Sequence, residues 1–148
     1  MSAEILLRYL HFLSIIVITA TLASEYVLVK DNLTRKEISR LSFIDLIYGL
    51  ASITVFAAGL TLWLGEYGKP AEWYSKNWIF HLKLTILVVI GLISIYPTIF
   101  FLKNRKGDGE ALVSVPKNIK RAIGIELILL AAIPILAGLM AKGIGLSL

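Results

Sequence analysis

Residues 46–64, LIYGLASITVFAAGLTLWL, form an apolar run without a single charged side chain. About 20 apolar residues in a helix cross the roughly 30 Å hydrocarbon core of a bilayer. Because lipid offers the backbone no hydrogen-bond partner, a spanning segment must be a helix or part of a closed barrel. The run is too continuous for a barrel strand, so it predicts a transmembrane helix, which we place at residues 43–64.

Three further apolar runs, at residues 5–29, 78–102 and 122–141, have the same character. The hydrophobic content of 57% and the mean hydropathy of +0.81 are too high for a soluble domain. Four spans of about 20 residues take up more than half of the chain and leave only loops. The sequence therefore predicts an all-α fold, an integral membrane bundle of four transmembrane helices that forms one domain over residues 1–148.

Lysine and arginine are unequally divided between the two ends of this predicted bundle. One end carries four, Arg8, Lys69, Lys76 and Lys142, and the other carries ten, Lys30, Arg35, Lys36, Arg40, Lys103, Arg105, Lys106, Lys117, Lys120 and Arg121. Since basic loops stay in the cytoplasm, we expect both termini outside, in a multi-pass protein of the plasma (inner) membrane. The basic end suits anionic membrane lipids, and we expect no nucleic-acid partner.

Two connections have a distinctive composition. Residues 103–121 are rich in charge and contain two glycines, which predicts a flexible connector. Tyr67, Trp73, Tyr74 and Trp78 cluster in the other long loop, where an aromatic belt at the membrane interface is expected. The chain has no cysteine, which excludes disulfides, thiolate metal sites and covalent c-type haem attachment.

Six ionisable residues lie within or just inside the apolar runs. A charge at that depth costs about 2.5 kcal/mol or more, so each must face a partner, a cavity or a ligand. The direction of the helices places His11, His81 and Lys83 toward the outer side and Glu25, Asp45 and Glu126 toward the cytoplasmic side. The chain is thus expected to hold two polar levels with apolar packing between them.

The cytoplasmic level is the candidate site for proton transfer. We expect Glu25, Asp45 and Glu126 to approach one another there with Arg40, Arg121, Tyr48 and Tyr96, and we name Glu25, Asp45, Tyr96 and Glu126 as the candidate catalytic residues. Three carboxyl groups at one depth cannot all stay ionised unless bases compensate them. The alternative is a purely structural network of ion pairs at the helix ends.

The outer level offers two imidazoles and an amine. His11 shares a helical face with Ser14, Ile18, Leu22 and Glu25, and should point into the bundle. Histidines from different helices can hold a haem b without any cysteine, which makes His11 and His81 candidate metal ligands. Lys83 could pair with a propionate, or it could extend to the interface.

The chain resembles a known family over nearly its whole length. The stretches RYLHFL, SEYVLVK, RLSFIDLIYGL, WIFHLKL, LISIYPT and IELILLAAIPILAGLMAKG are similar to those of domain of unknown function 2214, a bacterial family of four-span membrane proteins. Its most distinctive pieces here are the spacing Asp45, Tyr48, Gly49 and the run SIYPT at residues 94–98. Membership in this family implies the fold and no activity.

A more distant likeness suggests a cofactor. A histidine early in the first helix, Trp and then Lys in the third, and Arg and then Glu in the fourth are similar to the haem-binding four-helix membrane protoporphyrinogen IX oxidase family. The resemblance implies that His11 is a haem ligand and that Lys83, Arg121 and Glu126 match other residues of that family's site.

The leading hypothesis from the sequence is a membrane protein that binds haem b or a related tetrapyrrole through His11, with Lys83 and Arg121 assisting, and takes part in redox chemistry. The rival is a small transporter or channel subunit in which Glu25, Asp45, Glu126 and Lys83 line a proton or ion route. A homo-oligomer would then be needed to enclose the pathway. A third hypothesis is a structural membrane partner without catalysis.

Overall fold

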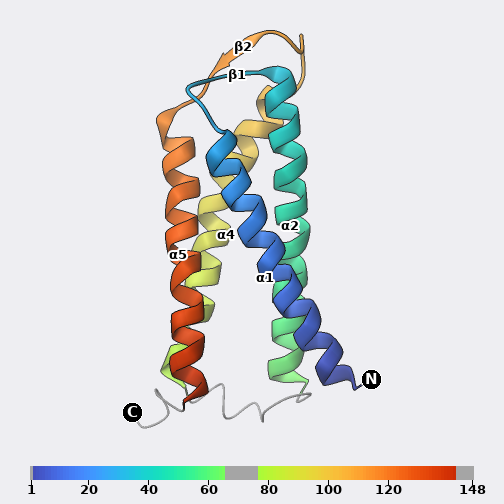
Figure 1. Cartoon of the computed structure of the whole chain (residues 1–148), viewed down its shortest axis with the longest axis vertical. Helices are drawn as coiled ribbons and strands as arrows, with labels where there is room; N and C mark the ends of the chain where they lie inside the picture. The colour runs from blue at the N-terminus through green and yellow to red at the C-terminus, as the bar shows by residue number, and fades with distance from the viewer. Residues whose placement is uncertain (1, 66–76, 143–148) are drawn as a thin grey trace.

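Four long helices make up most of the computed structural model, which describes residues 2–65 and 77–142 (Figure 1). They are α1 (Ala3–Leu28), α2 (Arg35–Leu64), α4 (Trp78–Asn104) and α5 (Lys117–Ala141). Each is long and apolar enough to cross a membrane, which confirms the predicted all-α bundle of four spans. Tyr67, Trp73 and Tyr74 of the predicted aromatic belt lie outside the described residues, and Trp78 is exposed at the start of α4.

Side-chain caps fix where three of the helices begin. Ser2 accepts a hydrogen bond from the amide of Ile5 at the start of α1, and Asn77 accepts one from Ile79 at the start of α4. Thr34 and Glu37 form a reciprocal capping box at the start of α2. This box explains why α2 begins at Arg35, eight residues before the predicted span, since a helix can continue beyond the apolar stretch that crosses the membrane.

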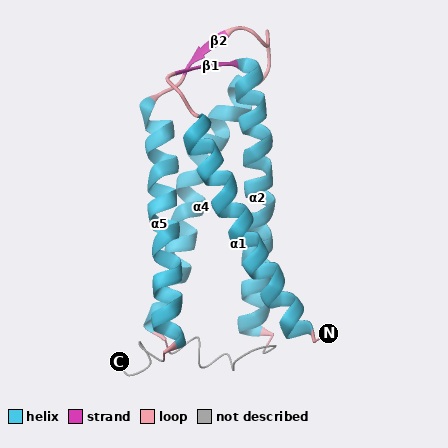
Figure 2. Ribbon diagram, in the orientation of Figure 1, coloured by secondary structure: helices cyan, strands magenta, loops and turns pink. Residues whose placement is uncertain are grey.

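A small antiparallel sheet closes one end of the bundle (Figure 2). It pairs β1 (Asn32–Thr34) with β2 (Leu112–Ser114), and Leu33 lies opposite Val113. Leu33 is fully buried and packs under the helix ends as part of the hydrophobic core. The sheet joins the α1–α2 connection to the α4–α5 connection.

The connector between α4 and α5 was expected to be flexible, and this prediction is wrong for the segment around β2. The start of α2 holds the connector, because the Arg35 guanidinium donates to the carbonyl groups of Asn104 and Lys106, each at 2.9 Å. The backbone amides of Arg35 and Lys36 also donate to Ala111 and Gly109. The glycines and charged residues of the connector form a tight turn held by hydrogen bonds rather than a flexible linker.

The helices pack as two closely associated pairs. α1 lies mainly along α2, and α4 lies mainly along α5, whereas α2 and α4 make a much thinner contact. α1 begins and α5 ends at the bundle end opposite the sheet (Figure 1). Many large apolar side chains of all four helices face outward and are exposed, as expected for helices surrounded by lipid.

Candidate functional site

Three buried carboxyl groups from three helices meet near the sheet end of the bundle. Glu25 of α1 and Glu126 of α5 are each 1% exposed, and Asp45 of α2 is 7% exposed. The Glu25 carboxyl lies close enough to Asp45 and Glu126 to interact with both. We call these three residues the carboxyl cluster. The structure thus brings together all three acidic residues that the sequence placed at one depth.

Two hydroxyl groups donate hydrogen bonds to the carboxyl cluster. The Tyr48 hydroxyl donates to Glu126 Oε1 at 3.2 Å, and Thr98 Oγ1 of α4 donates to Asp45 Oδ2 at 2.5 Å. Glu25 differs, because no hydroxyl or amide group donates to its two buried oxygens, and its nearest side-chain partner is the Asp45 carboxyl group. All four helices therefore contribute to the site, and Glu25 is its one carboxyl group without a donor.

The basic residues expected to compensate the cluster do not pair with it. Arg40 and Arg121 are exposed, and within the described ranges 2–65 and 77–142 the one ion pair joins Arg8 to Glu4. The alternative of a structural ion-pair network is therefore not found in that part of the chain. Tyr96, expected to point at the carboxyl groups, is instead 45% exposed on α4. Tyr48 makes the contact that was expected of Tyr96.

A groove of about 830 Å³ runs between α2 and α4 and reaches the carboxyl cluster. Asp45 and Tyr48 form part of its lining. The other lining residues are Ser39, Ser42, Phe43, Leu46, Gly49, Leu50, Ser52, Ile53, Gly91, Ser94, Thr98, Leu102 and Arg105. At the end nearer the sheet, Arg105 donates to Ser42 Oγ at 3.4 Å. No sequence pattern predicts this groove, because it depends on the distance between α2 and α4.

His11 occupies the far end of the bundle and packs against α2. Its ring lies close to the backbone of Val55, and Nδ1 is buried without a hydrogen-bond partner. A Cβ atom placed on Gly59 would lie 3.6 Å from the ring, so the glycine allows the close approach. Lys83 and Arg8 lie near enough to act electrostatically on the imidazole. The structure therefore brings His11 and Lys83 to the same level, as predicted from the sequence.

The second predicted metal ligand lies in a different environment. His81 is exposed on α4, where its ring makes an edge contact with Phe80 at 5.5 Å between centroids. Over residues 2–65 and 77–142, no three His, Cys, Asp or Glu side chains form a group that could hold a metal ion. A site built from His11 and His81 stays a prediction.

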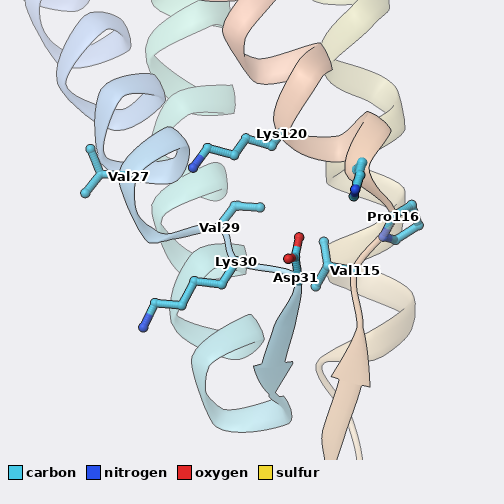
Figure 3. A pocket seen from close by; sticks show the side chains of 8 residues that line it. Val27, Val29, Lys30, Asp31, Val115, Pro116 and Lys120 are labelled. Atoms are coloured by element: carbon cyan, nitrogen blue, oxygen red, sulfur yellow. The ribbon is translucent and has the colours of Figure 1, made fainter.

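A second, smaller cavity of about 290 Å³ lies beside the sheet (Figure 3). Lys30, Lys117 and Lys120 line it together with Asp31, and the exposed Val27 forms part of its wall. The Lys120 ammonium also lies over the ring of Tyr26, 4.8 Å from its centroid. The three lysines that line this cavity give the sheet end of the bundle a positive surface.

Comparison with known proteins gives the family. Residues 3–145 match the family described as "Predicted membrane protein (DUF2214)". The chain belongs to this family. It is a predicted integral membrane protein with four candidate spans, so the carboxyl cluster of this DUF2214 protein lies within its membrane-spanning helices. No curated protein and no solved structure matches the chain significantly.

Proposed function

We propose that this DUF2214 protein is a proton-coupled membrane protein of the transport class, in which the carboxyl cluster binds the coupling proton. The observation that carries the proposal is Glu25, whose two oxygens are buried and have no hydrogen-bond donor. An unpaired carboxylate in such a place costs several kcal/mol, so the group is favoured in its neutral form. A neutral carboxyl beside two others can share its proton with them.

The hydroxyl donors Thr98 and Tyr48 distinguish Asp45 and Glu126 from Glu25. Asp45 accepts from Thr98, and Glu126 accepts from Tyr48, so each has a hydrogen bond that stabilises an ionised form. Glu25 interacts with both. A proton can therefore move from Glu25 to Asp45, and Asp45 reaches the surface of the bundle through the groove.

Reconstituted protein tests this proposal. Liposomes that contain the wild-type chain should show a flux of protons across the membrane under an imposed pH gradient. Glu25→Gln should abolish this flux. Glu110→Gln, in the exposed connector, is the matched control and should behave like the wild type. A carbonyl band in the infrared spectrum that titrates with pH should weaken in Glu25→Gln. The assignment would be refuted if wild-type liposomes show no proton flux and the infrared carbonyl band does not change with pH.

Haem b or a related tetrapyrrole at His11, with redox chemistry, is the second candidate function. The partnerless Nδ1 of His11 favours it, and Lys83 and Arg8 nearby would suit acidic substituents. The fit is incomplete, because the ring faces Val55 and Gly59 of α2, and a macrocycle would need α1 and α2 to separate there. Arg121, the other predicted cofactor residue, lies on α5 toward the sheet end, beyond the level of His11. We therefore derive no chemical step through haem.

The visible spectrum decides this second candidate. Protein purified after expression with a haem precursor should show a stoichiometric Soret band that shifts on reduction and disappears in His11→Ala. A featureless spectrum, or a band that survives in His11→Ala, would reject haem binding at this residue.

The orientation in the membrane follows from the charge distribution. The ten basic residues of the more basic side lie at or near the end of the bundle that carries the sheet. We infer that this end faces the cytoplasm at a bacterial plasma membrane, with both termini outside, and that anionic lipids contact its lysines.

A further inference from the structure

The groove between α2 and α4 opens toward lipid rather than toward water. Its outer edges include Leu46, Leu50 and Ile53 of α2, and these side chains are between 58% and 68% exposed on a membrane-spanning helix. From Ser39 to Ile53 the helix rises about 21 Å at 1.5 Å per residue. One leaflet contributes roughly 15 Å of hydrocarbon. A lipid chain of one leaflet therefore matches the groove in length.

Polar groups line the inner wall of the same groove, and their donors are already used. Ser52 donates to the carbonyl of Tyr48, Ser94 donates to that of Gly91, and Thr98 donates to Asp45. The Tyr48 hydroxyl donates to Glu126. Each of these hydroxyl oxygens can still accept a hydrogen bond but has no proton left to give. The inner wall therefore suits a ligand that donates hydrogen bonds.

Charge points to the same kind of ligand. Asp45 lines the groove, and no basic side chain pairs with it in the described part of the chain, since Arg8 and Glu4 form the one ion pair there. Thr98 and Glu25 use at most half of the roughly four lone-pair sites of the Asp45 carboxylate, which leaves room for a further donor. A cation with several N–H groups would satisfy Asp45 and the neighbouring hydroxyl oxygens together.

An opposite charge lies one helical turn away. Arg105 reaches Ser42, which precedes Asp45 by three residues, a rise of about 4.5 Å along α2. A guanidinium is well suited to bind a phosphate through two parallel hydrogen bonds. The groove thus presents a phosphate-binding group at its sheet end and a cation-binding group slightly deeper.

We propose that the α2–α4 groove binds one phospholipid with a phosphoethanolamine headgroup, the phosphate on Arg105 and the primary ammonium on Asp45. The acyl chain lies along the apolar part of the groove. A choline headgroup carries the same charges but has no N–H donor, and a glycerol headgroup has no cation. Binding should therefore rank the ethanolamine lipid above both. The lipid site shares Asp45 with the carboxyl cluster, but lipid retention is measured without a pH gradient, so this proposal and the proposed function can fail independently.

Native mass spectrometry of the full chain tests the proposal. The detergent-solubilised protein is incubated with equal amounts of ethanolamine, choline and glycerol phospholipids that carry identical acyl chains. The ethanolamine lipid should be retained about tenfold better than the choline lipid, the ratio expected for one charge-assisted hydrogen bond. Soluble phosphoethanolamine without chains should bind far more weakly, which distinguishes a lipid site from a free-phosphate site.

Two substitutions separate the two halves of the headgroup site. Asp45→Asn keeps an acceptor for Thr98 and should reduce ethanolamine binding to the choline level. Arg105→Gln should lower retention of all three phospholipids and keep their order. Lys103→Gln, exposed on the same end of α4, and Asp108→Asn, exposed in the connector, are the matched controls and should leave the pattern unchanged.

The comparison of ethanolamine and choline lipids needs only the wild-type protein, so its outcome does not depend on whether a variant folds. Equal binding of the ethanolamine and choline lipids by the wild type would overturn the proposal even if a variant failed to fold. An ethanolamine preference that persists in Asp45→Asn would also overturn it. Equal binding of soluble phosphoethanolamine and the intact lipid would remove the role assigned to the apolar groove.

Discussion

Replacing Glu25 or Glu126 with methionine should change stability in opposite directions, although both are buried to the same extent in one cluster. Methionine keeps the length of the side chain and removes the carboxyl group. Glu25→Met leaves no hydroxyl or amide donor without its acceptor, because neither oxygen of Glu25 accepts from such a group and Asp45 keeps its bond from Thr98. Removal of an unsatisfied buried polar group should stabilise the fold by about 1–3 kcal/mol.

Glu126→Met has the reverse effect. It takes away the carboxyl acceptor of the Tyr48 hydroxyl, whose side chain is 4% exposed, and leaves that buried donor without its acceptor. The expected cost is again about 1–3 kcal/mol, so the two variants should differ by roughly 2–6 kcal/mol. Denaturant unfolding in one detergent, followed by far-ultraviolet circular dichroism, measures both free energies of unfolding.

A double variant provides the control. Tyr48→Phe with Glu126→Met removes both partners of one hydrogen bond, and such paired replacement is close to neutral. The double variant should therefore recover most of the stability that Glu126→Met loses. If Glu25→Met and Glu126→Met destabilise the protein equally, the contact of Glu25 with Asp45 stabilises the fold as much as the Tyr48–Glu126 hydrogen bond does, and the reasoning fails.

Two further substitutions test the sheet end of the bundle. Gly107 has φ of +127°, and a Cβ there would lie 3.0 Å from the Arg35 side chain, so Gly107→Ala should destabilise the connector by about 1–3 kcal/mol. Faster hydrogen exchange of the β2 amides would report it, and unchanged exchange would contradict the assigned strain. Replacing Lys30, Lys117 and Lys120 with glutamine should lower retention of anionic phospholipid at least tenfold at low salt, at about 1 kcal/mol per lysine. An undiminished anionic adduct in native mass spectrometry would place that lipid elsewhere.

The sequence was sufficient for the helices and for the depth of the polar residues. Length and hydropathy decide a membrane span, and a helical repeat decides which residues share a face, so Ser14, Ile18, Leu22 and Glu25 are all buried as expected. The sheet was missed because its strands have three residues each and depend on pairing between distant segments. A periodic pattern cannot be recognised over so short a strand.

The partners within the site depended on packing that no sequence pattern specifies. Tyr48 follows Asp45 by three residues and so shares its helical face, a signal that favoured Tyr48 over Tyr96. Tyr96 precedes the buried Pro97, and a neighbour on a helix is turned by about 100°, which leaves Tyr96 on the outer surface. Thr98 gave no signal of its own, since a threonine in an apolar helix most often bonds to its own backbone.

The two polar levels differ in what surrounds them, and this difference favours chemistry at one face of the membrane. Between His11 and Glu25, which are about 21 Å apart along α1, the buried side chains are mainly apolar, with Ser14 and Thr21 as the polar ones on that helix. The apolar ones include Ile18, Leu22, Val55, Ile90 and Leu130, all buried. A proton on the carboxyl cluster therefore meets a hydrophobic layer toward His11 but an open groove toward lipid through Asp45. Proton exchange should thus be faster from the sheet end, where the groove reaches the exposed Arg105, and transfer across the membrane would require these helices to rearrange.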